Sequence, residues 1–280
     1  MEQVRGQVER LKGESYGFGN RVCLSIACSR PEDVEAKSLA AAPEFPLQEL
    51  RLDYLADAAA GLAALRPFLR AHPEIMFLGT CRPVRSGGRF AGSGTDEVQV
   101  LASAAEAGCR ILDLSLETAE ELGADSLALL RSKGAAVILS FHDFERTPAL
   151  EETLSRMRRF APDLYKIVPT ANCLRDSLDL LKLLSTGTGQ GETPVVGISM
   201  GEAGVVTRIL GPRFGSAFTF AAAEAASATA PGQLSAKLLT ELYRAGDITS
   251  RTRLFAVAGD PIHTSLSPLM HNTAFHEAGL

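Results

Sequence analysis

Eight short runs of apolar, β-favouring residues recur along the chain, and Ala- and Leu-rich segments with charges at helical spacing lie between them. Most runs are continuously apolar, as expected for parallel strands that are covered on both faces. Eight strand–helix units within residues 21–246 predict an α/β protein with a closed (β/α)8 TIM barrel; an open doubly wound sheet is the alternative. The runs are RVCLSIAC (21–28), QELRLDY (48–54), IMFLGTC (75–81), RILDLSL (110–116), AAVILSF (135–141), LYKIVP (164–169), PVVGISM (194–200) and SAFTFA (216–221).

Composition and charge exclude several classes of protein. A net charge of −5 argues against a nucleic-acid partner, which would require a basic surface. No apolar run approaches the roughly 18–20 residues that cross a bilayer, and the polar N-terminus lacks the apolar core of a signal peptide. Five cysteines without a C-x-x-C pair indicate reduced thiols and no metal site. We therefore expect a cytoplasmic protein with no membrane or nucleic-acid partner.

Polar side chains lie in or just after these runs, at the ends that a barrel directs toward one mouth. Each has an ordinary explanation when taken alone. Glu49 and Arg51 are two residues apart and could form a structural ion pair, and Arg82 could be a surface loop residue. Their combination at a single mouth instead indicates a binding site. The candidates are Ser25, Glu49, Arg51, Arg82, His142, Asp143, Lys166, Arg208, Thr229 and Gln233.

Lys166 has the apolar neighbours Leu164, Ile167 and Val168, so its amine either reaches solvent or loses its charge. Burial in an apolar environment disfavours the ammonium form, and a neutral amine attacks ketones to give a Schiff base. The alternative is that Lys166 points outward and covers apolar surface with its stem. His142, at the end of the preceding strand, favours the catalytic interpretation, because an iminium needs a general base at the adjacent carbon.

Two further residues extend this hypothesis. Arg208 would bind a substrate carboxylate through two parallel hydrogen bonds. Asp143 directly follows His142 and either orients the imidazole or caps the next helix. Together these residues suggest that a small keto acid is activated as an iminium and deprotonated at the adjacent carbon.

Several motifs resemble, in order, those of the type I 3-dehydroquinate dehydratase family. They cover about residues 21–245 and are ELRLDYL, TCRP, SFHDFERTP, LYKIVP, ISMGEAGVVTRILGPRFGSAFTF and ASATAPGQ. The family is a (β/α)8 barrel that converts 3-dehydroquinate to 3-dehydroshikimate in the shikimate pathway of aromatic amino-acid biosynthesis. The resemblance implies a hydro-lyase that needs no cofactor and no metal, because a lysine holds the substrate as a covalent imine. Family members commonly dimerise, so a homodimer is a further expectation.

Carried over to this sequence, the resemblance implies that Lys166 is the Schiff-base nucleophile and that His142 is the general acid and base. Arg208 would hold the substrate carboxylate, and the loop 227–233 would close over the mouth and exclude water. The substrate-binding residues would be Ser25, Glu49, Arg51, Arg82, Arg208, Thr229 and Gln233.

The sequence departs from the family at Ser86, where an acidic residue commonly precedes a Gly-Gly pair near the catalytic histidine. This leaves open how the imidazole is supported, and Asp143 or a water is the candidate. Thr229 replaces a common serine and keeps the hydroxyl. Two other functions stay open: an aldolase that uses the same iminium, and a non-catalytic sensor of the metabolite. The arginine-rich mouth disfavours the first, and the presence of both Lys166 and His142 disfavours the second.

The final run, LFAVAGDPIHTSLSPLMHNTAFHEAGL, resembles the opening of shikimate dehydrogenase, as in a dehydratase/dehydrogenase fusion. The resemblance implies that Ser265 and Ser267 bind a shikimate-type substrate. The catalytic residues and the NADP motif of that family are not in the sequence, so we expect no oxidoreductase activity and no NADP. We expect an N-terminal extension (1–20), the barrel (21–246), and a linker with a partial second α/β domain (247–280). A C-terminal cap on the barrel is the alternative.

Overall fold

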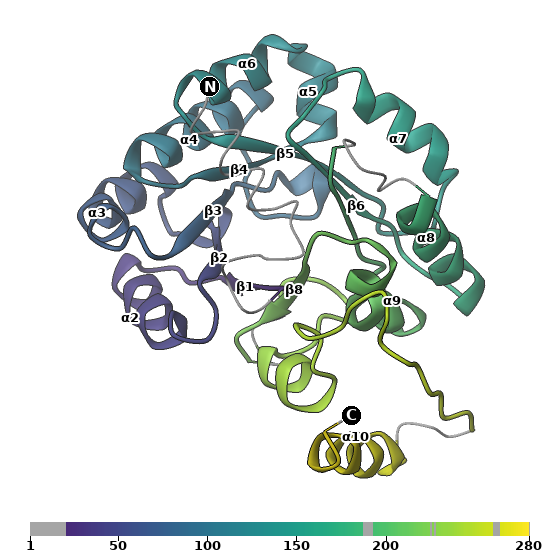
Figure 1. Cartoon of the computed structure of the whole chain (residues 1–280). Helices are drawn as coiled ribbons and strands as arrows, with labels where there is room; N and C mark the ends of the chain where they lie inside the picture. Colours follow the sequence, from purple (N-terminus) through teal and green to yellow (C-terminus); the bar gives the residue numbers. More distant parts are fainter. Residues whose placement is uncertain (1–20, 187–192, 225, 227, 260–263, 280) are drawn as a thin grey trace.

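Eight parallel strands form one sheet with the order β7-β6-β5-β4-β3-β2-β1-β8 (Figure 1). The computed structural model describes residues 21–186, 193–224, 226, 228–259 and 264–279, and the extension predicted over residues 1–20 lies outside them. Each strand overlaps one of the predicted runs. The strands are β1 (Val22–Ile26), β2 (Leu47–Arg51), β3 (Met76–Thr80), β4 (Ile111–Ser115), β5 (Ala136–His142), β6 (Leu164–Val168), β7 (Val195–Gly197) and β8 (Thr219–Ala222).

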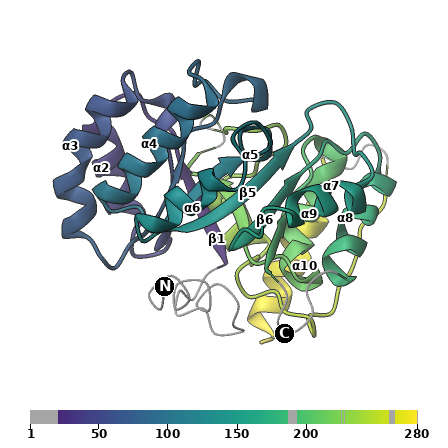
Figure 2. The ribbon, with the colours of Figure 1, turned by 90° about the horizontal axis from the view of Figure 1, so that it is seen from above.

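The sheet curves around until its two edges meet. β8 pairs with β1 in parallel. At the other edge, β7 contacts the segment that leads into β8, where the Ala217 N–H donates to the Val195 carbonyl oxygen at 2.8 Å. In an open doubly wound sheet the first strand lies inside the order and the edges stay apart. The (β/α)8 barrel prediction is therefore confirmed, and the open-sheet alternative is wrong (Figure 2).

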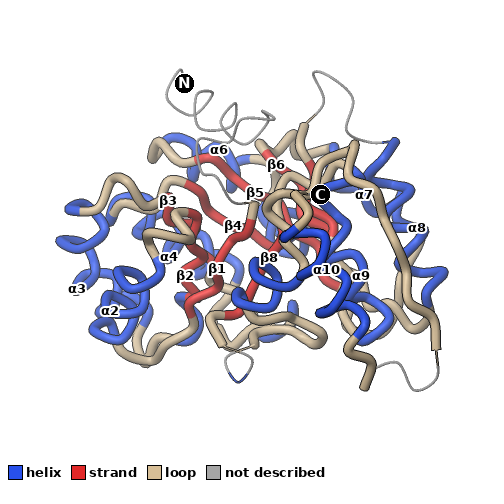
Figure 3. Tube along the Cα trace, turned by 60° about the horizontal axis from the view of Figure 1, so that its bottom comes forward, coloured by secondary structure: helices blue, strands red, loops and turns tan. Residues whose placement is uncertain are grey.

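Helices cover the outside of the barrel (Figure 3). Local signals set their starts: Ser93 caps α4 in a capping box with Asp96. No helix in the described part of the chain is long and apolar enough to cross a bilayer. The helices are α2 (Pro31–Ala41), α3 (Ala58–Ala71), α4 (Gly94–Ala107), α5 (Leu116–Leu122), α6 (Asp125–Ser132), α7 (Leu150–Arg158), α8 (Leu174–Thr186), α9 (Val205–Leu210) and α10 (Ser267–Glu277), with the short turns η1 (Leu52–Tyr54), η2 (Val84–Ser86), η3 (Glu202–Gly204), η4 (Gly211–Phe214) and η6 (Leu238–Leu242).

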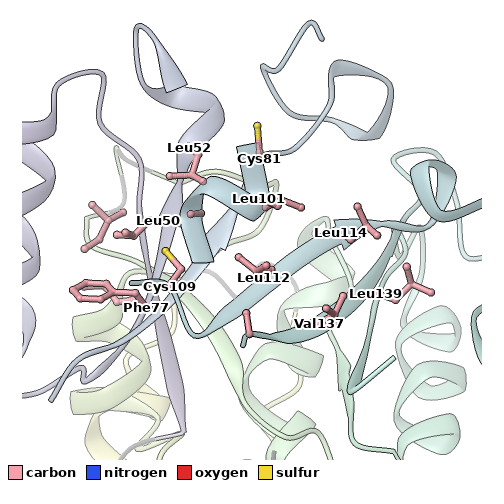
Figure 4. Packing of buried hydrophobic residues seen from close by; sticks show 14 of the residues in the cluster. Leu50, Leu52, Phe77, Cys81, Leu101, Cys109, Leu112, Leu114, Val137 and Leu139 are labelled. Atoms are coloured by element: carbon pink, nitrogen blue, oxygen red, sulfur yellow. The ribbon is translucent and has the colours of Figure 1, made fainter. Parts of the chain in front are cut away.

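Both faces of the strands are buried, because successive side chains of a strand point to opposite sides. One face packs against the helices in a layer that includes Leu50, Leu112 and Leu139 (Figure 4). The other face fills the lower interior of the barrel with residues such as Ile111 and Leu164. This double burial is why the runs are apolar throughout and show no alternation in the sequence.

Residues after the barrel form a peripheral segment (Figure 1). Its helix α10 contacts η6, where the Asn272 side-chain amide donates to the Leu242 carbonyl oxygen at 2.9 Å. No residue of α10 is buried. The segment therefore exposes a group of large apolar side chains, which are Leu254, Phe255, Val257, Leu266, Leu269 and Met270.

Candidate active site

The polar side chains at the mouth of the barrel result from the alternation of side chains along each strand, which also places apolar side chains in the barrel interior. Ile111 of β4 belongs to the apolar interior and Asp113 follows two residues later; in β6, Leu164 and Lys166 repeat this step. Since the period of a strand is two, the polar side chains point into the barrel one layer above the apolar ones. The other polar residues of this layer are Ser25, Glu49, Thr80 and Ser140.

One cleft at the mouth opens to solvent, and Ser25, Glu49, Thr80 and Lys166 of this layer line it. Of the ten binding-site candidates from the sequence, all except Asp143 lie in its wall. They are Ser25, Glu49, Arg51, Arg82, His142, Lys166, Arg208, Thr229 and Gln233. The structure thus brings the predicted group together in one place, and their individual roles stay predictions.

Lys166 is only 6% exposed, and its amine lies among charged and aromatic groups. Nζ donates to Asp113 Oδ2 at 2.9 Å, lies 3.6 Å from Glu49 Oε1, and lies 4.0 Å from the centre of the Phe220 ring. The alternative that Lys166 points outward is wrong. The expected apolar surrounding is wrong as well, because two carboxylates face the amine and stabilise a positive charge on it.

His142 ends β5, and its ring lies in the wall of the cleft. Burial, and then the positive charges of Arg82 and Lys166, lower the pKa of His142 well below its usual value, and the Asp113 carboxylate opposes this only in part. A neutral imidazole can accept a proton at neutral pH. Its Nδ1 atom is buried and has no hydrogen-bond partner among the described residues.

Asp113 connects two of the buried cations. One carboxylate oxygen accepts from Arg82 at 2.6 Å and the other accepts from Lys166 at 2.9 Å. Burial alone would raise the pKa of Asp113, but the charges of Arg82 and Lys166 hold it well below its usual range. Arg82 also donates to the Ser140 hydroxyl at 2.6 Å. The buried positions of both cations thus depend on one carboxylate.

Glu49 and Arg51 have different partners. Glu49 accepts from the hydroxyls of Ser25 at 2.6 Å and Thr80 at 2.8 Å. Arg51 donates to both carboxylate oxygens of Asp53, at 2.9 and 2.7 Å. The alternative of a structural ion pair between Glu49 and Arg51 is therefore wrong.

Arg208 is a buried cation at the mouth, 2% exposed. Within the described parts of the chain, no carboxylate lies within ion-pair distance of its guanidinium; Nη2 donates to the Pro231 carbonyl oxygen at 3.3 Å, and Nε is buried without a partner. Burial lowers the pKa of Arg208 to about 10. A buried guanidinium without a counter-ion is suited to bind an external carboxylate.

The loop predicted over 227–233 is described from residue 228 onward and lies on the mouth. The Pro231 carbonyl accepts from the Gly201 N–H at 3.3 Å, and the Gln233 amide donates to the Ser25 hydroxyl at 3.4 Å. Thr229 donates to the Gln233 side-chain oxygen through both its N–H and its hydroxyl. The loop therefore bridges β7 and β1 across the opening.

Asp143 and Ser86, the two residues connected with support of the imidazole, are engaged elsewhere. Asp143 Oδ1 accepts from the N–H groups of Glu145 and Arg146, each at 2.9 Å. Asp143 thus caps the turn after β5. It does not cap the next helix, because the N-cap of α7 is Ala149, so that alternative is wrong. The Ser86 hydroxyl donates to Glu117 Oε2 at 3.0 Å.

The C-terminal candidates lie apart from this cleft. The Ser267 N–H donates to the Ser265 hydroxyl oxygen at 3.3 Å at the start of α10, and neither residue lines the cleft. No group of three or more His, Cys, Asp or Glu side chains that could hold a metal ion occurs in the described residues.

Sequence reasoning missed several residues of the mouth, which are Thr80, Asp113, Ser140, Phe144 and Phe220. A signal was present for Asp113, because a carboxylate inside RILDLSL is as anomalous as a lysine inside LYKIVP. Thr80 and Ser140 are likewise polar residues inside apolar runs, IMFLGTC and AAVILSF. No comparable signal marks Phe220 among the other apolar residues of its strand.

The fold and the site define a class: (β/α)8 barrels with a buried lysine, an imidazole and an arginine that has no counter-ion among the described residues, all around one cleft. The sequence profile of the type I 3-dehydroquinase family matches residues 22–250, and the chain belongs to this family. The 3-dehydroquinate dehydratase of Desulfotalea psychrophila is 32% identical over 219 residues, which cover 76% of this chain and 92% of that protein.

The chain is also similar to two-domain relatives. The bifunctional 3-dehydroquinate dehydratase/shikimate dehydrogenase of Arabidopsis thaliana is 32% identical over 232 residues, which are 82% of this chain but only 37% of the plant protein.

Among solved structures, the type I 3-dehydroquinate dehydratase of Clostridium difficile has a TM-score of 0.69 and 29% identity, and the match covers 80% of this chain and 91% of that one. The dehydroquinate dehydratase and shikimate dehydrogenase from S. pombe shares the fold at a TM-score of 0.69 and 23% identity, over 98% of this chain and 52% of that one.

Proposed function

We propose that this chain is a 3-dehydroquinate dehydratase, which forms an imine between Lys166 and the substrate ketone and releases 3-dehydroshikimate. The observation that carries the proposal is the buried Lys166 amine in one cleft with the His142 imidazole and the unpaired Arg208. The names of the relatives supply the substrate, and membership of the family makes a Schiff base the expected intermediate. The reaction belongs to the shikimate pathway of aromatic amino-acid biosynthesis.

The proposed chemistry begins with the amine. Once Nζ of Lys166 has lost a proton to a base, it forms a bond to the C3 carbonyl carbon while the carbonyl oxygen takes up a proton. The base returns its proton to that hydroxyl, which leaves as water, and the C=N⁺ iminium that remains acidifies the neighbouring C2–H bond. These steps need no redox cofactor and no metal, because the iminium itself withdraws the electrons.

His142 completes the elimination in this proposal. The neutral imidazole removes the C2 proton, and the C–H electrons form the enamine. The imidazolium then gives this proton to the C1 hydroxyl, which leaves as water as the enamine returns to a conjugated iminium. Addition of water at C3 and departure of Nζ release the product ketone and regenerate the amine.

The other residues of the cleft would bind the substrate. Arg208 would take its carboxylate, since the guanidinium is buried without a counter-ion. The hydroxyl groups would contact Glu49, Arg51 and Arg82, and the loop residues would close the pocket. The remaining contacts would come from Ser25, Thr229 and Gln233.

The test combines turnover with chemical trapping. Wild-type protein incubated with 3-dehydroquinate should develop the absorbance of a conjugated enone, and borohydride with substrate should label Lys166, as mapped by mass spectrometry. Lys166→Ala should abolish turnover while substrate still binds, and His142→Ala should accumulate trapped imine. Lys182→Ala, which changes an exposed lysine of α8, is the control and should behave as wild type.

The same experiment separates the competing functions. An aldolase would give a labelled lysine but no enone absorbance, and cleavage products instead. A non-catalytic sensor would bind the substrate without turnover or label. A label on a lysine other than Lys166 would refute the assignment of the nucleophile.

The proposal extends to the organisation of the chain. Residues 21–246 would form the dehydratase unit, and residues 247–280 would begin a second unit similar to shikimate dehydrogenase, in which Ser265 and Ser267 would contact a shikimate-type ligand. Exposed apolar side chains on this segment support a second unit rather than a docked cap. A cytoplasmic location is consistent with free thiols at all five cysteines. A homodimer stays a prediction, which sedimentation can test.

A further inference from the structure

The imidazole of His142 is held without a hydrogen bond to Nδ1 from any described residue. The outer torsion of a histidine side chain is broad and roughly two-fold, so a catalytic ring needs a further restraint. The carboxylate oxygen Oδ1 of Asp143 caps the turn after β5, and the Ser86 hydroxyl donates to Glu117. This leaves packing as the source of the restraint.

Phe144, two residues after His142, supplies such packing. The two rings are nearly parallel, with 15° between their planes and 6.2 Å between their centroids. Phe144 lies in the wall of the cleft and is 44% exposed. Its ring therefore lies beside the imidazole in the cleft wall and is partly open to solvent.

Gly87 fixes where the Phe144 ring can lie. A Cβ atom at this position would lie 1.9 Å from Cζ and 2.2 Å from Cε2 of Phe144, so the ring edge rests where any side chain would be. Gly87 also has a φ of 78°, which glycine adopts without strain. The turn after β3 thereby holds a ring that comes from the turn after β5.

We propose that Phe144, seated on Gly87, is a positioning residue that fixes the plane of the His142 imidazole and shields it from water. The inference rests on the proposed function, in which His142 is the general base. Offset parallel rings are a favourable arrangement of aromatic pairs. A fixed ring plane keeps the basic nitrogen aimed at the substrate carbon, and small errors in such an aim cost large factors in rate.

The shielding has a consequence for protonation. Burial is the largest cause of the lowered pKa of His142, and the proposed shielding by the Phe144 ring would add to that burial. Removal of the ring would admit water and raise the pKa, while the charges around the imidazole stay in place. Those charges are Arg51 at the end of β2, Arg82 after β3 and Lys166 of β6, which lower the pKa, and Asp113 of β4, which raises it.

Phe144→Leu removes the planar ring and keeps much of the apolar volume. We expect kcat to fall roughly tenfold to a hundredfold, with KM changed less than about threefold because the charged side chains proposed to hold the substrate stay in place. The acid limb of the kcat/KM profile should move to higher pH. Borohydride added at steady state should trap a larger fraction of Lys166 adduct, because proton removal from the iminium has become slow.

Two further variants displace the ring from either side of the contact. Gly87→Ala places a methyl group against the ring, and Phe144→Tyr places an oxygen on Cζ, the ring atom nearest Gly87. Both should reproduce the kinetics of Phe144→Leu, and Gly87→Ala should add little in the Phe144→Leu background. Val84→Ala is the control, since Val84 lies in the adjacent turn, is 61% exposed and does not line the cleft.

The outcomes distinguish this inference from the proposed function. If wild-type protein shows neither turnover nor a Lys166 adduct, both fail. If wild-type protein shows both, and Phe144→Leu keeps the wild-type kcat, only the role of Phe144 is overturned. The role is also overturned if kcat falls while the pH profile and the trapped fraction stay unchanged, as expected for a merely structural contact. Thermal unfolding checks each variant, and Phe144→Tyr decides in the same way if Phe144→Leu does not fold.

Discussion

Asp113 is the shared counter-ion of two buried cations in the barrel mouth: it is fully buried and forms ion pairs with both Arg82 and Lys166. Removing one partner of a buried ion pair leaves the other charge buried and unpaired. We therefore expect Asp113→Asn to lower the free energy of unfolding by about 3–5 kcal/mol. We also expect turnover to fall sharply, because Nζ of Lys166 loses its anchor. Urea unfolding and steady-state kinetics measure the two effects.

The control for this substitution is Asp179→Asn, which removes the exposed partner of Arg175 on α8. Exposed ion pairs contribute little to stability, so this variant should unfold and turn over as wild type does. Equal losses in the two variants would show that burial of the Asp113 cluster has no special energetic weight.

The lowered pKa of His142 predicts an unusual pH dependence. A general base must be neutral to accept a proton, and an imidazole is neutral above its pKa. Because burial and the nearby cations lower that pKa well below its usual value, kcat/KM should stay level from neutral pH to below about 6.5. The acid limb should appear only at lower pH. An acid limb centred at or above the pKa of a free imidazole would contradict the assignment of His142 as the base.

For the residues of the candidate site, the sequence identified single side chains but did not identify their partners. Lys166 and His142 stood out because each is polar within or beside an apolar strand. Their surroundings depend on which strand positions face inward and on the register between strands, for example Ser140 of β5 beside Lys166 of β6. An apolar run that is buried on both sides does not reveal its inward face. The two carboxylates at the Lys166 amine were therefore not predicted.

The elements themselves were more predictable, because a strand buried on both faces leaves an uninterrupted apolar run. All eight strands overlap predicted runs. Closure of the barrel between β7 and the segment that leads into β8 was inferred from the count of eight strand–helix units, because no residue in the sequence marks this contact. The loop over the mouth was assigned by resemblance alone, since its residues are small and polar and resemble any surface turn.

That loop gives a prediction that concerns backbone shape. Gly232 has a φ of 72°, and a Cβ atom there would lie only 2.6 Å from the Gly201 carbonyl oxygen. Neither backbone can yield easily, so Gly232→Ala should prevent the loop from lying on the mouth. The contact of Gln233 with Ser25 would then be lost. We expect KM to rise roughly tenfold or more, because Thr229 and Gln233, the loop residues proposed to bind the substrate, would move away. Steady-state kinetics measures this change.

Gly134→Ala is a matched control for this change. Gly134 has a φ of 84°, similar to that of Gly232, but a Cβ atom there meets nothing within 4 Å. Both variants should lose about 1 kcal/mol of stability from backbone strain, and only Gly232→Ala should change the kinetics. A normal KM in Gly232→Ala would show that the loop position does not matter for substrate binding.

For the whole molecule, the contrast is between a barrel with a continuous core and a segment without one. The family profile ends at residue 250. Beyond it, α10 has no buried residue, and its described contacts with the barrel side include one amide hydrogen bond and a contact between Arg244 and His276. With so few contacts, we expect the segment to contribute little to the stability of the barrel. Its exposed apolar side chains also favour aggregation, since monomeric proteins rarely leave a large apolar patch uncovered.

A variant that ends at Arg251 tests this view of the molecule. It keeps the contacts of Arg213 with the Thr249 and Ser250 carbonyls, and it removes no residue that lines the cleft. We expect kcat and KM within about twofold of those of the full chain, because removal of a segment that does not line the cleft leaves transition-state binding intact. We also expect less aggregation, as measured by light scattering. A large loss of activity, or a much lower unfolding temperature, would instead identify the segment as an integral cap. The segment would then act through the barrel, because α10 contacts it at η6 and neither element lines the cleft.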